Sequence, residues 1–223
     1  MKKQWTFVLA TSLAAVVWSA GAAANLVQNG SFENLKGSQT LTNTYFEAVS
    51  SGSNRIKNWK VAAASGKSVD SVREGTVASA LDWAQDGQYA IDMAGTPGPG
   101  KITQKIKGAD DGQAYLLSFW TSSNGTAGKT MDVLWNGVKQ GATIVTAFAQ
   151  GTWVQHQFTV YGTAGVETLR FKGLTSGTNG VLLDNVSLTA VPLPPAIILF
   201  GSVLFGFATM ARKRRAGESA LAA

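Results

Sequence analysis

The feature that most constrains the fold of this sequence is a series of short apolar runs over residues 25–190. Clusters of Gly, Asn, Asp and Ser separate these runs, and such spacing is typical of a β-sandwich or β-barrel. Apart from a weak alanine patch near 77–84, no window of ten or more residues shows the 3.6-residue period of a helix. The predicted strands include 89–93, 114–121, 131–135, 153–161, 166–172 and 181–189. The sequence therefore predicts one all-β domain.

Residues 1–24 have the pattern of a secretory signal peptide. Two lysines near the start are followed by an uncharged, mostly apolar run over 5–21, and three alanines precede Asn25. The alternative is a membrane anchor, but the apolar run falls short of the ~20 residues that a spanning helix needs. We predict export with cleavage after Ala24, so that Asn25 becomes the mature N-terminus.

The C-terminal segment begins with residues that cannot continue a strand or a helix, because each proline fixes φ and removes a hydrogen-bond donor. These residues are Val191, Pro192, Leu193, Pro194 and Pro195. Residues 196–211 follow, uncharged and mostly apolar, and then a basic cluster formed by Arg212, Lys213, Arg214 and Arg215. We divide this end of the chain into a tail over 191–215 and a terminal stretch over 216–223.

Residues 196–211 are predicted to form a transmembrane helix. A helix of that length spans about 24 Å, and bilayer thinning or flanking residues can cover the remainder of a ~30 Å hydrocarbon core. A buried core helix would instead show a polar stripe, whereas this segment is apolar all round. The basic cluster places residues 216–223 on the cytoplasmic side.

The formal charge of +6 comes mainly from the ends of the chain. Six of the 19 Lys and Arg residues and one of the 13 Asp and Glu residues lie in the terminal segments, so the central domain carries a net charge of about +1. The high isoelectric point therefore reflects membrane topology, and nucleic acid is not an expected partner.

Cysteine is absent and His156 is the sole histidine. Disulfides, thiolate metal sites and Cys–His nucleophiles are thereby excluded. Strand alternation places His156 on one face with Val154, Phe158 and Val160, which favours a buried, satisfied ring over a catalytic base. No G-x-S-x-G motif accompanies it, and we expect no enzyme activity and no cofactor other than a structural calcium ion considered below.

Three stretches together resemble the choice-of-anchor C family, which is related to plant cell-wall domains and, more distantly, to carbohydrate-binding modules. The mature start reads NLVQNGSFE over 25–33, the middle contains IKNWKV over 56–61 and DGQYAIDM over 86–93, and the end reads LLDNVSL over 182–188. The resemblance covers essentially all of 25–190. It implies an antiparallel jelly-roll β-sandwich of the galactose-binding-like type.

The tail resembles a PEP-CTERM sorting signal, and more closely the variant whose motif reads VPLPA. Here the motif carries one additional proline, Pro195. In such systems an exosortase-type enzyme recognises the tail in bacteria that make exopolysaccharide. The resemblance thus implies an exosortase partner and a cell-surface or extracellular location, with the chain anchored transiently or permanently in the inner membrane. A permanently membrane-held protein is the alternative.

Carbohydrate contact is predicted at the loops that carry Tyr45, Trp83, Asp86 and Asp92. Trp83 lies between an acid and a Gln-Asp-Gly turn, so it is expected to be exposed and to offer a flat face for pyranose stacking. Asp92 alternates with Tyr89 and Ile91 and is expected to face a sugar or water. Solvated loop acids are the alternative interpretation.

Glu33 and Asp184 lie at opposite ends of the domain, and the resemblance implies that these ends meet. In related sugar-binding modules, acids at such positions help to hold a structural calcium ion, and hard oxygen ligands suit Ca²⁺. The alternative is that Asp184 accepts hydrogen bonds from backbone amides.

The function favoured by these observations is that of a non-catalytic surface protein that binds extracellular polysaccharide. An adhesive protein that binds other proteins is the second interpretation. A secreted hydrolase or lyase is the third, and the lack of an evident acid–base pair disfavours it.

Overall fold

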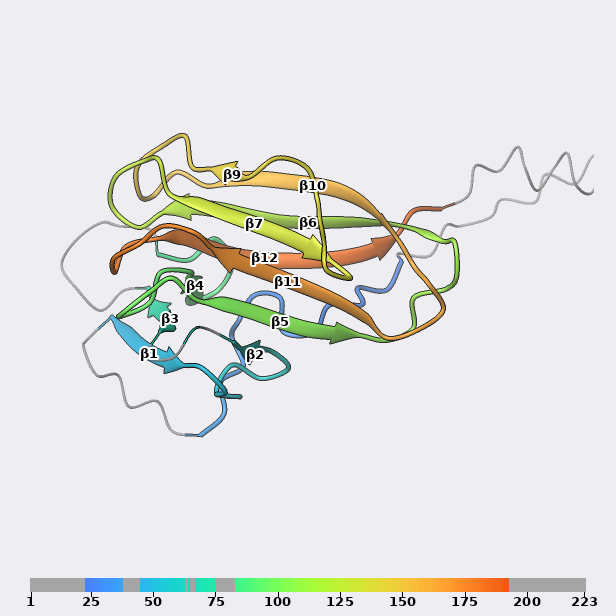
Figure 1. Cartoon of the computed structure of the whole chain (residues 1–223), viewed down its shortest axis with the longest axis horizontal. Helices are drawn as coiled ribbons and strands as arrows, with labels where there is room; N and C mark the ends of the chain where they lie inside the picture. Colours follow the sequence, from blue (N-terminus) through green and yellow to red (C-terminus); the bar gives the residue numbers. More distant parts are fainter. Residues whose placement is uncertain (1–22, 38–44, 63, 65–66, 75–82, 193–223) are drawn as a thin grey trace, which may run out of the picture.

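The computed structural model describes residues 23–37, 45–62, 64, 67–74 and 83–192 (Figure 1). Within these ranges every regular element is a strand: β1 (Phe46–Ser50), β2 (Lys60–Val61), β3 (Ser68–Arg73), β4 (Tyr89–Asp92), β5 (Lys101–Ile106), β6 (Ala114–Ser123), β7 (Thr130–Trp135), β8 (Val138–Lys139), β9 (Ile144–Val145), β10 (Val154–Tyr161), β11 (Glu167–Gly173) and β12 (Val181–Ala190). All six strands predicted from the sequence are present, as β4, β6, β7, β10, β11 and β12.

Residues 1–22 of the predicted signal peptide (1–24) and the whole of the predicted membrane helix (196–211) lie outside the described residues. Within the part of the chain that the structure describes, no helix is long and apolar enough to cross a membrane. The membrane helix and the sorting motif therefore stay predictions.

The strands form two antiparallel sheets that pack face to face (Figure 1). The first sheet has the order β1-β3-β4-β12-β6-β10, and the second has the order β2-β5-β11-β7-β8 with β9 paired to β7. From β4 onward the chain passes back and forth between the two sheets. The fold is therefore an all-β, antiparallel jelly-roll β-sandwich, and the prediction of the fold class is confirmed.

The core between the sheets is built around aromatic rings from both of them. Phe119 on β6 meets Phe171 on β11 edge to face, with ring centroids 5.0 Å apart. Trp59 packs on Phe171 at 6.1 Å, and Phe32 packs on Trp59 at 5.5 Å. All four side chains are buried, and such aromatic contacts add to the stabilisation from apolar burial.

The NLVQNGSFE segment is structural, since it runs beside the last strand of the domain. The Leu26 amide donates to the Leu188 carbonyl (2.9 Å), and the Val186 amide donates to the Gly30 carbonyl (2.9 Å). A Cβ atom at Gly30 would lie 1.9 Å from the Val186 oxygen, so only glycine fits there. The two ends of the domain therefore meet, and both leave the sandwich at the same end (Figure 1).

Candidate functional site

Trp83 belongs to a small apolar cluster on the outer face of the first sheet, together with Val72, Ala90 and Leu182. Its ring stacks on Tyr45 with centroids 5.6 Å apart, and only 9% of its surface is exposed. The prediction that Trp83 is exposed is wrong. The cause is that the Glu74 carboxylate accepts the Trp83 amide (2.7 Å) and so holds the ring against the apolar outer face of the sheet.

Asp92 does not face a ligand either, because its side chain is completely buried. One oxygen accepts the amides of Ala94 (2.8 Å) and Gly180 (2.9 Å), and the other accepts the Asn124 side-chain amide (2.6 Å). Burial raises the pKa of Asp92 to about 6, although these hydrogen bonds oppose the shift. Alternation correctly predicts that Asp92 points away from the main core, but two loop amides and the Asn124 side chain enclose it instead of leaving it open to a sugar or to solvent.

Asp70 lies directly opposite Asp92 across β3 and β4 and is also buried. Its carboxylate accepts the Thr96 amide (2.9 Å) and hydroxyl (2.7 Å), while burial raises its pKa. The two acids thus fasten the loop after β4. Their burial leaves no room for a substrate between them, so they are not a hydrolytic pair.

Glu33 and Asp184 both accept hydrogen bonds from the turn that precedes β4. They can do so because the two ends of the domain lie side by side. Glu33 accepts the amides of Gln88 and Tyr89, both at 2.8 Å. Asp184 accepts the amides of Gln85 (2.8 Å) and Asp86 (2.9 Å). Asp86 itself is exposed on this turn.

From the sequence, Asp184 is expected to be either a calcium ligand or an acceptor of backbone hydrogen bonds. The hydrogen bonds of Asp184 agree with the second role. Burial raises the pKa of Asp184 to about 7, against the effect of these amide bonds. The described residues contain no group of three or more His, Cys, Asp or Glu side chains that could hold a metal ion. A calcium ion at Glu33 and Asp184 stays a prediction.

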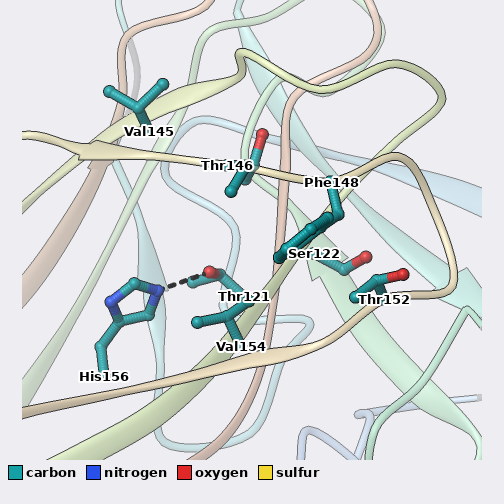
Figure 2. Close-up of a pocket in the computed structure, with 9 residues that line it drawn as sticks. Thr121, Ser122, Val145, Thr146, Phe148, Thr152, Val154 and His156 are labelled. Atoms are coloured by element: carbon teal, nitrogen blue, oxygen red, sulfur yellow. Dashed lines mark hydrogen bonds between the residues drawn. The ribbon is translucent and has the colours of Figure 1, made fainter.

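His156 borders a small cavity of about 40 Å³ between β6, β9 and β10 (Figure 2). Its ring stacks on Phe119 at 5.4 Å, and Nε2 lies 2.8 Å from the Thr121 hydroxyl (Figure 2). Burial lowers its pKa. The prediction of a satisfied ring is confirmed by this hydrogen bond, but the ring is only partly buried and not fully buried as expected. The cavity is close to the volume of one water molecule, ~30 Å³, and is too small for a sugar ring.

A larger cavity of about 330 Å³ opens beside β2 and β5. We call it the lysine groove, and its lining residues are Gln28, Lys36, Asn54, Asn58, Trp59, Lys60, Thr103, Gln104 and Lys105. Its volume falls at the lower end of the range of about 300–1,000 Å³ for ligand pockets.

The groove is braced by hydrogen bonds between segments far apart in the sequence. The Gln28 amide donates to Gln104 Oε1 (2.9 Å), and Gln104 Nε2 donates back to the Gln28 carbonyl (2.8 Å). Trp59 is buried beneath the groove and donates its indole N–H to the Asn29 carbonyl (2.9 Å). These contacts fix the groove's wall before any ligand arrives, which lowers the entropic cost of binding.

The groove's chemistry suits recognition. Among the described residues that line it are three lysines, a hydroxyl and four carboxamides, and no carboxylate. One of the carboxamides, Gln104, is already bonded to the Gln28 backbone. Carboxamides both donate and accept hydrogen bonds, and ammonium groups donate. The groove can therefore bind a ligand rich in hydroxyl groups or negative charge, but it lacks the two acids that glycoside hydrolysis generally uses.

Comparison with solved structures finds carbohydrate-binding modules and an adhesin domain. TmCBM61 in complex with β-1,4-galactotriose has 14% identity and a TM-score of 0.48, covering 76% of this chain and 100% of that one. The CBM22-1 xylan-binding domain of Xyn10C from Paenibacillus barcinonensis has 15% identity and a TM-score of 0.46, covering 79% and 100%. The K1 cleaved adhesin domain of Lys-gingipain from Porphyromonas gingivalis has 15% identity and a TM-score of 0.46, covering 66% and 99%.

Among curated proteins, halomucin from Haloquadratum walsbyi is 34% identical over 171 residues. The aligned region is 74% of this chain but only 2% of halomucin, so the chain spans a very small part of that relative. A family model described as "Protein of unknown function (DUF642)" matches residues 25–189. Because this match covers well over half of the sequence, the chain belongs to the DUF642 family.

Proposed function

We propose that this protein is an exported surface or extracellular-matrix protein whose β-sandwich binds carbohydrate without catalysis. The observation that carries the proposal is the lysine groove, where carboxamide, hydroxyl and ammonium groups converge in a cavity of about 330 Å³. Sugar hydroxyls both donate and accept hydrogen bonds, as carboxamides do. No carboxylate occurs among the described residues that line the groove, which favours binding over glycoside cleavage.

Glycan binding by the fragment 25–192 tests this proposal. The fragment is suitable because the described residues of the main core cluster, with those packed against it, lie between Leu26 and Ala190. We expect binding to at least one polysaccharide on an array of plant and bacterial glycans, with the affinity then measured by calorimetry. An array without any bound glycan would contradict the proposal. Repeating the array with a chelator tests the calcium prediction at the same time.

A groove variant and a matched control locate the binding. Asn54 and Asn58 are exposed in the groove, and the positive φ of Asn58 (69°) makes glycine the suitable replacement there. We expect Asn54→Ala combined with Asn58→Gly to weaken glycan binding. Gln157→Ala, an exposed carboxamide on β10 of the other sheet, should leave it unchanged. Equal effects of the two variants would place the glycan elsewhere.

The sorting of the protein is the second part of the proposal. Export would remove residues 1–24, and an exosortase-type enzyme would act on the tail that starts at Val191, with the basic cluster in the cytoplasm. Mass spectrometry of the surface form should find Asn25 as the first residue and a new C-terminus near 192–196. A surface form that still contains Met1 would contradict export with cleavage, and one that retains the basic cluster would favour a permanent membrane protein.

A further inference from the structure

The outer face of the second sheet carries a concentration of positive charge. Strand pairing places Lys60, Thr103 and Arg170 in one row across β2, β5 and β11. Lys101 and Lys172 form a second row, and Lys105 and Thr168 form a third. The residues that alternate with these on β5 and β11, including Ile102 and Phe171, are buried in the core. The charged residues therefore point outward.

We call Lys60, Lys101, Lys105, Arg170 and Lys172 the outer basic face. Asp132 offsets part of this charge. It shares a row with Lys172 across β11 and β7, forms an ion pair with Lys139 at 2.8 Å and interacts electrostatically with Lys172. Asp70, Asp92, Glu167 and Asp184 are buried elsewhere. Because the central domain as a whole is nearly neutral, this concentration of cations on one face is a local feature of the fold.

Two details indicate that the face is arranged for a ligand. Lys101 and Lys172 lie directly opposite each other, and like charges in that position destabilise a sheet. Threonines hold two other cations against the sheet: Lys105 Nζ donates to Thr168 Oγ1 (2.8 Å), and Arg170 Nε donates to Thr103 Oγ1 (3.3 Å). A bound anion would relieve the repulsion and meet donors that are already positioned.

The geometry suits a chain with repeated charges. Lys101 and Lys105 are four residues apart on β5, which corresponds to about 13 Å along the strand. Lys60 and Lys105 also line the lysine groove, and Lys36 adds a further cation there. The outer basic face and the groove thus form one continuous surface that combines cations with carboxamides.

From this surface we infer that the ligand is an acidic polysaccharide with carboxylate groups along its chain. The polysaccharide lies across the outer basic face and places one sugar residue in the lysine groove. This inference rests on the proposed function and narrows it to an anionic glycan. The groove's carboxamides favour a polyhydroxylated ligand over nucleic acid, whose single strands are usually held by aromatic stacking platforms.

The test measures binding of the fragment 25–192 to two polysaccharides with the same sugar backbone, the charged polygalacturonate and its uncharged, fully methyl-esterified form. We expect polygalacturonate to bind more tightly, and its affinity to fall as NaCl rises from about 50 to about 200 mM, because exposed charges are screened. Lys101→Gln combined with Lys172→Gln should weaken binding on the order of tenfold. Its folding stability should change little, since the removal of two opposed like charges offsets the loss of the attraction between Lys172 and Asp132.

A charge-matched control is Lys67→Gln combined with Lys129→Gln, which removes two lysines from outside the three rows. We expect it to leave the affinity for polygalacturonate essentially unchanged. Equal loss with both double variants would overturn the inference, because net charge and not the outer basic face would then control binding.

Three further outcomes would overturn the inference. Equal affinity for the esterified form, without salt dependence, would show a neutral glycan ligand and leave the proposed function intact. Binding to neither form, while only neutral glycans bind on the array, would have the same meaning. Equally tight binding of a DNA duplex would show a general polyanion surface. The proposed function itself fails only if no glycan binds at all.

Discussion

Replacement of Trp83 by alanine separates a packing role from a ligand-stacking role. A tryptophan side chain buries about 200 Å², which at ~25 cal/mol per Å² corresponds to about 5 kcal/mol as an upper bound. The residual structure of unfolded chains lowers this to about 3–4 kcal/mol. The Trp83 ring stacks on Tyr45 and is only 9% exposed. Trp83→Ala should therefore lower the free energy of unfolding by about 3–4 kcal/mol, as truncation of a buried aromatic residue does.

Thermal and urea unfolding of the fragment 25–192 measure this effect. In a domain of this size a loss of about 3–4 kcal/mol lowers Tm by about 6–15 °C. Trp83→Phe retains a ring to stack on Tyr45, so it should lose clearly less stability. If Trp83→Ala changed the free energy of unfolding by less than ~0.5 kcal/mol and abolished glycan binding, the ring would be an exposed stacking platform and the packing account would be refuted.

Three further predictions concern stability. Gly87→Ala should lower the free energy of unfolding by more than ~1 kcal/mol, because φ at Gly87 is +75° and a Cβ atom would lie 2.5 Å from the Glu33 carboxyl group. A free energy that is unchanged in urea unfolding would contradict this. Asn25→Ala should lower the free energy of unfolding by about 1–2 kcal/mol in the same assay, since the Asn25 side chain accepts hydrogen bonds from two backbone amides. A loss near zero would mean that water takes over these two hydrogen bonds. Stability should fall as pH rises from about 4 to about 7, because the folded-state pKa of Asp184 is raised to about 7 and the folded protein therefore binds the proton more tightly than the unfolded chain. Asp184→Asn should flatten this slope, and a free energy of unfolding that rises over the same pH range would contradict the assignment.

The fold was largely predictable because it depends on alternation along single strands. The run from Trp153 to Tyr161 alternates so regularly that its inward face, with His156 and Phe158, could be assigned before the structure. Strands such as β3 (Ser68–Arg73) carry polar residues at most positions and were not predicted. Their pairing depends on neighbouring strands, which a single sequence does not identify.

The candidate site was much less predictable, because it depends on surroundings that come from distant segments. Trp83 has polar neighbours in the sequence, but the apolar outer face that it covers comes from β3, β4 and β12. Asp92 points outward as alternation predicts, yet Gly180 and Asn124 enclose it.

The lysine groove was missed for the same reason, since Gln28 and Gln104 meet only in the folded chain. One signal was present in the sequence. Lys101, Thr103 and Lys105 alternate with apolar or packed residues, which marks a polar outer face of a strand.

The most direct test of carbohydrate binding in the lysine groove is a ¹H–¹⁵N NMR titration of the fragment 25–192 with a glycan selected on the array. Trp59 forms part of the buried lining beneath the groove and Trp83 lies on the other sheet, so their indole N–H signals report on the two candidate sites separately. The account predicts that the Trp59 indole and the Gln104 side-chain amide shift with glycan concentration while the Trp83 indole stays fixed. Shifts of the Trp83 indole and the Asp86 amide, with the groove signals unchanged, would contradict it.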